Sequence, residues 1–253
     1  MYGFYGRLLY IDLSCGKHTW CDIDESRLRH FLGGIGLGTS LLYDYAPPAV
    51  DPFSPDNPLI FSSAPLTGTG LTTTAKYAVV TKSPLTGFIA DSLSSSHFLL
   101  ELKRLGIDAL VITGRAASMA YLLIRDDSVE IRPAEHLRGK GPGETEHLIR
   151  TELNDPEVWT ASIGKAGENR VRYATISNEG RHAGRGGVGA GVAGAPPGPA
   201  HGVHAPARGP GHQHRLGHGG PRLAPGRRRG VPAAAREGAV GPRPSAHGAG
   251  AGA

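Results

Sequence analysis

Cysteine is nearly absent from this chain, and so is any long apolar run. Its 253 residues include two cysteines, Cys15 and Cys21, too few for the framework of a disulfide-rich secreted protein. The two could approach each other in a hairpin, but a pair of free thiols is the favoured interpretation. No apolar run reaches the roughly 20 residues of a membrane span, and Arg7 and Asp12 interrupt the opening apolar stretch before a signal peptide could form. The sequence therefore predicts a cytoplasmic protein without a membrane span.

Residues 191–253 lack most amino-acid types. The segment contains no Ile, Phe, Tyr, Trp, Met, Asn, Asp, Lys, Thr or Cys, and consists mainly of Gly, Ala, Pro, Arg and His. Too few large apolar side chains are present to offset the conformational entropy of folding, so we expect a disordered low-complexity tail. Out-of-frame translation is the favoured origin, because these residues have codons rich in G and C. A Pro/Gly linker and a basic nucleic-acid-binding arm are the alternatives.

Charge is divided unevenly along the chain. The formal net charge is +5, but residues 191–253 hold eight arginines and one glutamate. Residues 1–190 therefore carry 19 basic and 21 acidic side chains, a balance of −2. A mildly acidic domain does not predict nucleic acid as a partner. About 190 residues suffice for one domain with a substantial core, so we assign residues 1–190 as the domain and 191–253 as the tail.

Apolar periodicity in residues 1–190 predicts an α+β fold of two β-sheets with a few helices. Short strands outnumber helices, and several are joined as hairpins, which disfavours a doubly wound parallel sheet. Asp24 or Ser26 can cap a first helix through Leu28, and Ser96 can cap another that ends at Gly106. Strands are expected at 7–13, 18–23, 58–61, 76–81, 108–113, 121–125, 129–132, 158–163 and 171–176, and further helices at 39–45 and 144–153.

No catalytic set is evident from residue spacing. The sequence has no nucleophile elbow, no HExxH motif and no Cys/His cluster with metal-ligand spacing. His97 and His182 are therefore interpreted as surface or capping residues. Residues 181–189 are more informative, because two arginines and four glycines offer positive charge and bare backbone N–H groups to an anion. The same glycines fit the dinucleotide pattern GxGxxG only weakly, since we expect neither a following helix nor the acidic residue of that fingerprint; a tight turn explains them equally well.

Several motifs together resemble one known family. They are PLTGT at 65–69, TKSPLTG at 81–87, ELKR at 101–104 and AGEN at 166–169. In this order they are similar to the amino-terminal domain of the tungsten-containing aldehyde ferredoxin oxidoreductases. The resemblance covers residues 1–190 and ends abruptly after Ala190, as a frame shift would leave it.

The resemblance implies a fold and an activity. In the family, an α+β base carries tungstopterin or molybdopterin, a bis-pterin cofactor with a magnesium ion between its two pterins. Later, mostly helical domains supply the cysteines of a [4Fe–4S] cluster. The enzymes oxidise aldehydes to carboxylates and pass the electrons to ferredoxin, and a homodimer of the intact enzyme is compatible with the resemblance. Neither nucleic acid nor a membrane is an expected partner.

The resemblance also implies the positions of the cofactor contacts. Lys76 replaces a pterin-contacting arginine, so the charge is kept but the planar fork is lost. Leu93 replaces an asparagine that helps to hold magnesium, which leaves that contact to backbone carbonyls, at Leu93 and at His182. The expected cofactor-binding residues are Lys76, Ser94, Ser95, Arg181, His182, Ala183, Gly184 and Arg185.

Two hypotheses follow from these observations. The first is a fragment of an aldehyde ferredoxin oxidoreductase-type enzyme that is inactive by itself, since a [4Fe–4S] cluster needs four thiolates and only two cysteines are present. The second is a stand-alone anion-binding module that uses residues 181–189, with the tail as a basic arm and no redox activity. Metal analysis distinguishes them, because the first predicts tungsten or molybdenum in the intact homologue and the second predicts none.

Overall fold

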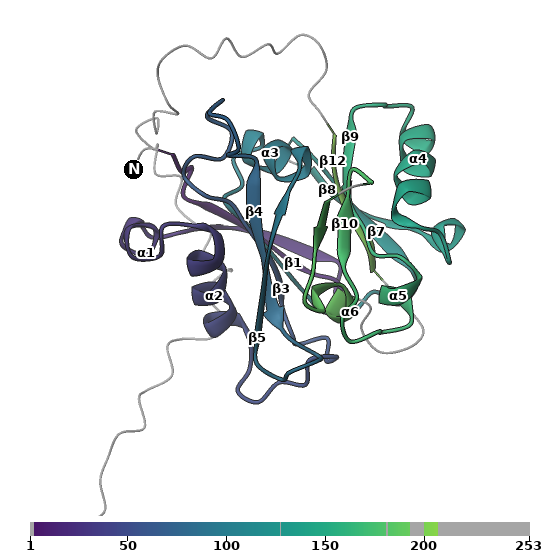
Figure 1. The fold of residues 1–253 in the computed structure, drawn as a ribbon, viewed down its shortest axis with the longest axis horizontal. Coiled ribbons are helices and arrows are strands. Elements are labelled where there is room, and N and C mark those ends of the chain that lie inside the picture. Colours follow the sequence, from purple (N-terminus) through teal and green to yellow (C-terminus); the bar gives the residue numbers. More distant parts are fainter. Residues whose placement is uncertain (1–2, 127, 181, 193–199, 207–253) are drawn as a thin grey trace, which may run out of the picture. The chain divides into compact units, whose positions relative to one another are not determined.

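The computed structural model describes residues 3–126, 128–180, 182–192 and 200–206 (Figure 1). Within these residues the elements form layers: α1 and α2, a six-stranded sheet, two smaller sheets, and α4 on the far side. The fold is α+β, as the sequence predicts. No helix of the described residues is long and apolar enough to cross a membrane.

The six-stranded sheet is mixed. Its order is β2-β1-β6-β3-β4-β5, and only the pairing of β1 with β6 is parallel. Strand β5 therefore forms one edge of the sheet. The strands are β1 (Arg7–Asp12), β2 (Lys17–Asp22), β3 (Leu59–Ser62), β4 (Lys76–Lys82), β5 (Ile89–Ser95) and β6 (Ala109–Thr113).

Two helices cover one face of this sheet. In α1 (Glu25–Phe31), the Asp24 side chain accepts a hydrogen bond from the backbone N–H of Ser26, which confirms one of the two expected caps. Helix α2 (Gly34–Tyr45) begins five residues before the expected 39–45 segment. The glycine at 38 lets this helix pack closely on the sheet, because a Cβ there would lie 2.6 Å from Val80 of β4.

The other face packs against a second, four-stranded sheet of order β8-β7-β12-β9. Its strands are β7 (Ala120–Arg125), β8 (Ser128–Pro133), β9 (Val158–Ala161) and β12 (Ala200–Pro206). Helix α4 (Pro142–Leu153) covers its outer face through Ile149, after a 3₁₀ turn at Glu135–Leu137. Helix α3 (His97–Arg104) contacts β9 and β12 and contributes Phe98 to the core between the sheets.

Strand β12 lies in the segment 191–253, which we expected to be a disordered tail, and gives residues 200–206 a place in the sheet. The strand pairs in parallel with β7 and antiparallel with β9, so it occupies an interior position of the sheet. Backbone hydrogen bonds to two neighbours can hold a sequence of low intrinsic β-propensity. Helix α6 (Val188–Val192) also enters the expected tail; the other residues of 191–253 lie outside the described part.

A two-stranded sheet, β10 (Ile176–Asn178) with β11 (His182–Gly184), completes the layer between the larger sheets, with the short helix α5 (Lys165–Glu168) nearby. The expected strand at 171–176 is wrong except at its last residue. Residues before it form a turn, in which the Ala174 N–H donates to the Val171 carbonyl over 2.8 Å. The β-branched and aromatic residues of this run do not by themselves distinguish a strand from a turn.

A buried ion pair fixes the amino-terminal segment to the sheet. Lys103 of α3 donates to both Asp108 Oδ1 and Ser63 Oγ, and its ammonium lies 4.7 Å from the centre of the Phe4 ring. Asp108 is fully buried, and its Oδ2 accepts the backbone N–H groups of Tyr5 and Gly6 at 2.7 and 2.6 Å. Burial lowers the pKa of Lys103, and the carboxylate of Asp108 opposes this shift.

Candidate functional site

The expected site residues of β4 and β5 meet at one end of the six-stranded sheet. Lys76 begins β4 and pairs with Ser95 at the end of β5, while Tyr77 pairs with Ser94. Because neighbouring residues of a strand point to opposite faces, Lys76 and Ser95 lie on one face of the sheet and Tyr77 and Ser94 on the other. Lys76 is exposed and Ser94 is buried.

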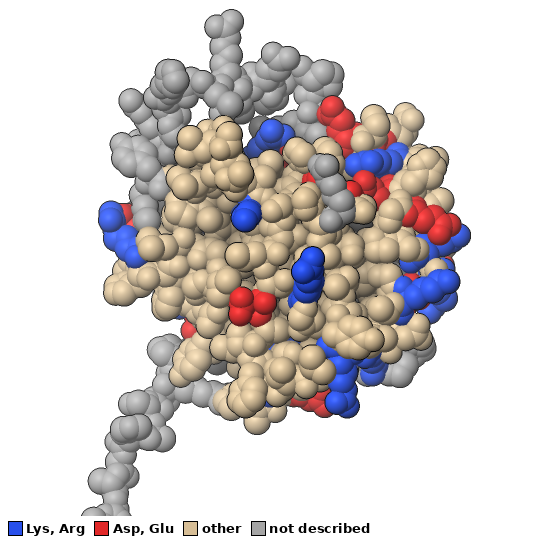
Figure 2. Space-filling model, viewed as in Figure 1, with Lys and Arg blue, Asp and Glu red and all other residues tan. Residues whose placement is uncertain are grey.

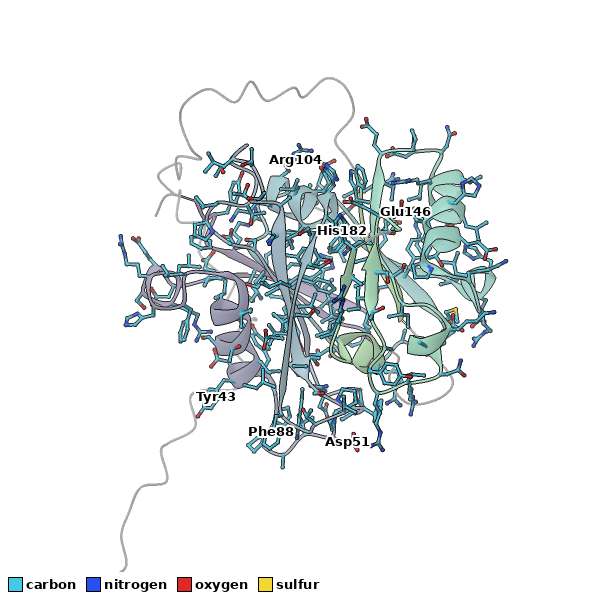
Figure 3. The ribbon with its side chains drawn as sticks, viewed as in Figure 1. Tyr43, Asp51, Phe88, Arg104, Glu146 and His182 are labelled. Carbon is cyan, nitrogen blue, oxygen red and sulfur yellow. The ribbon has the colours of Figure 1, made fainter. Side chains whose placement is uncertain are left out.

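The β10–β11 hairpin brings the distant loop to the same edge. His182 pairs with Asn178 in the hairpin, and β11 contacts β5 (Figure 3). The backbone N–H of Arg185 donates to Ser92 Oγ of β5 over 2.7 Å. His182, Ala183, Gly184 and Arg185 thus gather beside Ser94 and Ser95, while Arg181 lies outside the described residues.

A buried polar network joins the hairpin to the sheet. The Asn178 side-chain amide donates to the hydroxyl of Tyr77, and Ser94 Oγ donates to Asn178 Oδ1 over 3.2 Å. Burial raises the pKa of Tyr77 to about 12, against hydrogen bonds that lower it. The hydroxyl of Ser94 is therefore engaged inside the protein, and a contact from Ser94 to a ligand falls to its backbone.

Positive charge and bare backbone lie at this edge. Lys76 and Arg185 are both exposed, and neither forms an ion pair with another described residue. Figure 2 shows this face as largely uncharged, with isolated charged side chains among neutral ones. Gly180 and Gly186 have φ of +61° and +73°, and a Cβ there would meet no described atom within 4 Å, so neither glycine is packed against the described residues. Unpaired cations and accessible backbone fit a multiply charged anion.

Gly187 and Gly189 of the loop serve packing. A Cβ at Gly187 would lie 2.3 Å from the carbonyl oxygen of Arg172, and one at Gly189 would lie 2.4 Å from that of Thr175. Contrary to our expectation, a helix does follow the loop, because α6 begins at Val188. It has five residues and packs against α5. Close packing therefore accounts for the glycine at 189, inside α6, without a dinucleotide.

Apolar side chains extend along the outer part of β5. Leu93, the position expected to contribute a backbone carbonyl, is 54% exposed, as is Ile89. The neighbouring Phe88 is 78% exposed. Leu93 has no side-chain oxygen, so only its backbone can serve a cation. Among the described residues no group of three or more His, Cys, Asp or Glu could hold a metal ion, and both cysteines are free.

The family model of the aldehyde ferredoxin oxidoreductase N-terminal domain matches residues 8–195. The chain belongs to this family. The match includes every element of the site, from Lys76 to Arg185, and the fold of this aldehyde ferredoxin oxidoreductase domain is the one described above.

Individual relatives agree with this assignment. The chain is 49% identical over 191 residues to the tungsten-containing aldehyde ferredoxin oxidoreductase of Pyrococcus furiosus. The aligned region covers 75% of this chain and 32% of that protein. The chain is 37% identical over 208 residues to the WOR-like subunit of an aliphatic sulfonate oxidoreductase from the same organism. Among solved structures, the active-site complex BamBC of benzoyl coenzyme A reductase with 1,5-dienoyl-CoA matches with a TM-score of 0.76 and 40% identity, covering 81% of this chain and 31% of that one. The chain thus spans about a third of the length of these relatives.

Sequence reasoning missed the residues that assemble the site. Tyr77 and Asn178 are 101 positions apart, and His97 and Glu179 are 82 apart. No spacing rule connects such pairs. The sequence offered only a local candidate for the cap of α3, namely Ser96. Its side chain makes no capping hydrogen bond. The carboxylate of Glu179 accepts the backbone N–H of His97 instead.

Proposed function

We propose that this chain forms the cofactor base of an enzyme that oxidises aldehydes to carboxylates and passes the electrons to ferredoxin. The observation that carries the proposal is that Lys76 of β4 and Arg185, whose loop bonds Ser92 of the edge strand β5, are both exposed and form no ion pair with another described residue. Membership of the aldehyde ferredoxin oxidoreductase family, and relatives named as tungsten-containing, support the same function.

The residues present fit a bis-pterin cofactor with phosphate groups. Lys76 and Arg185 would pair with the phosphates, with Arg181 as a third cation, while the open backbone at Gly180 and Gly186 allows close approach. Carbonyl oxygens are ligands that Mg²⁺ accepts, so the backbones of Leu93 and His182 would hold magnesium between the pterins. The bound tungsten or molybdenum would supply the two-electron chemistry of aldehyde oxidation.

This polypeptide by itself would be inactive. It contains two cysteines, both free, whereas a [4Fe–4S] cluster takes four thiolates. The matched relatives are about three times as long, and their remaining portions would supply the cluster and enclose the aldehyde. We place the protein in the cytoplasm, in keeping with its two free thiols.

Metal retention tests the proposal. The full 253-residue chain is expressed in a host that makes the pterin cofactor, with tungstate or molybdate in the medium, and the purified protein is assayed for metal and for oxidised pterin fluorescence. We expect both to co-purify, and the double variant Lys76→Ala/Arg185→Ala to lose at least about tenfold of each, because two charge-assisted contacts are removed. Lys17→Ala/Arg29→Ala removes the same charge from β2 and α1 and should retain both.

The competing hypothesis has a different signature. A stand-alone anion-binding module with a basic tail would bind inorganic pyrophosphate through the Arg185 loop but retain neither metal nor pterin. Pyrophosphate binding together with a metal-free, pterin-free protein would therefore replace the oxidoreductase proposal with the binding-module one.

A further inference from the structure

Glu179 closes the amino-terminal end of α3 from a distant part of the chain. It lies in the turn between β10 and β11 with φ of +53°, a conformation that is uncommon for a residue with a side chain. Its Oε1 accepts the backbone N–H of His97, the first residue of α3, and lies 3.0 Å from His97 Nδ1. The Glu179 side chain is only 6% exposed. A carboxylate at this end of a helix is favoured by the helix dipole and satisfies a free N–H group.

The imidazole of His97 is itself held in place. It stacks on Trp159 of β9, with ring centroids 4.4 Å apart and planes at 24°. The guanidinium of Arg150 from α4 lies 5.3 Å from the centre of the Trp159 ring, and Arg150 Nε donates to the Val158 carbonyl. Helix α4 and strand β9 thus support the partner of Glu179, so the carboxylate meets a fixed donor pair.

The residue before Glu179 faces the opposite way. Asn178 is 1% exposed and bonds Tyr77 of β4 and Ser94 of β5. Two consecutive side chains therefore fasten the end of β10 to two different elements, the six-stranded sheet and α3. On the other side of the turn, the backbone N–H of Arg185 donates to Ser92 of β5, and the Arg185 side chain forms no ion pair with another described residue.

We propose that Asn178 and Glu179 are positioning residues, which preset the β10–β11 turn and the following loop for the anionic part of the ligand. The inference rests on the proposed function, because it concerns the same loop. A loop fixed before binding costs less ordering entropy when the ligand arrives, and affinity rises accordingly. Glu179 also occupies the end of α3, so phosphate is directed to Lys76 and Arg185 and away from the helix terminus.

Glu179→Ala tests the inference, with Glu179→Gln as the conservative rescue, because glutamine keeps the Oε1 acceptor. Glu144→Ala, which removes an exposed ion-paired carboxylate of α4, is the matched control. Hydrogen exchange is followed in peptides covering residues 176–187, with strand β6 as internal reference, and inorganic pyrophosphate binding is measured on the same full-length proteins. In Glu179→Ala we expect about tenfold faster exchange in the hairpin alone, and pyrophosphate affinity lower by about fivefold. Glu179→Gln should stay within about threefold of wild type in both.

A second variant, Tyr77→Phe, tests the inference even if Glu179→Ala does not fold. Tyr77→Phe removes the acceptor of Asn178 and keeps the aromatic ring in the core, and it should loosen the same peptides. Unchanged hairpin exchange in both Glu179→Ala and Tyr77→Phe overturns the inference, as does faster exchange with unaltered pyrophosphate affinity. If the wild-type chain binds no pyrophosphate, the proposed anion site fails, and the exchange result alone then decides whether Asn178 and Glu179 hold the hairpin.

Discussion

Asp108→Asn should be among the most destabilising single substitutions in this domain. Asparagine can still accept the N–H groups of Tyr5 and Gly6, but it leaves the ammonium of Lys103 buried without a counter-charge. Breaking a buried pair in this way costs about 3–5 kcal/mol. The variant can also avoid the unpaired charge by leaving Lys103 neutral, and the cost of this neutralisation is an upper limit on the destabilisation. For a lysine of ordinary pKa 10.5, removing the proton at pH 7 costs about 5 kcal/mol, at roughly 1.4 kcal/mol per pH unit.

The penalty should depend on pH in a defined direction. Burial lowers the pKa of Lys103 in the folded protein, and loss of Asp108 lowers it further. Between the folded and unfolded pKa values the unfolded chain binds more protons, so the free energy of unfolding of the variant rises with pH. At pH 9 the cost of neutralising Lys103 falls to about 2 kcal/mol. The difference between variant and wild type should therefore shrink from about 3–5 kcal/mol at pH 7 to about 2 kcal/mol at pH 9.

Urea unfolding at pH 7 and pH 9, followed by tryptophan fluorescence, measures both quantities. Asp22→Asn, which removes an exposed carboxylate at the end of β2, is the control and should change stability by less than about 0.5 kcal/mol. A penalty below about 1 kcal/mol for Asp108→Asn at pH 7, or one of equal size at both pH values, would refute this account of the pair.

Three further outcomes are expected. Gly187→Ala should cost more than about 3 kcal/mol in urea unfolding, because its Cβ would overlap the Arg172 carbonyl at φ of +90°, whereas Gly180→Ala, in open space, should cost about 1 kcal/mol. Burial raises the pKa of Tyr77 to about 12, so the stabilisation that comes from its protonated form is complete below pH 10 and is lost towards pH 12, by roughly 3 kcal/mol. Tyr77→Phe should flatten this loss of stability between pH 10 and pH 12, and an equal loss in both proteins would contradict the role of Tyr77. Reconstitution of the chain with iron and sulfide should give no stoichiometric [4Fe–4S] absorbance near 400 nm and no aldehyde-dependent viologen reduction, and a full cluster or turnover would disprove the inactivity of the isolated chain.

Local rules predicted the elements that local interactions determine. The β1–β2 hairpin follows from alternation on both sides of a turn, and α1 follows from the Asp24 cap. Strand β5 was missed because four of its seven residues are polar, which is untypical of a strand. Pairing with every residue of β4 determines its conformation, and such pairing is a tertiary interaction that its own sequence does not encode.

The site was predictable only in part. Charge and glycine content indicated the Arg185 loop as an anion site, and the family resemblance added Lys76 and the serines of β5. Neither indicated that Ser94 faces inward to Asn178, or that Glu179 closes α3. Those contacts depend on where the β10–β11 hairpin docks, and docking is decided by packing between sheets that are far apart in the chain.

The place of β12 has a consequence for synthesis on the ribosome. Strands β7 and β9 leave the exit tunnel well before residues 200–206, yet β12 lies between them in the finished sheet. Until it arrives, each of the two earlier strands presents an open row of N–H and C=O groups. The nascent chain therefore passes through an interval in which two unpaired edges are available to other chains, and a chaperone that shields such edges would raise the yield of folded protein.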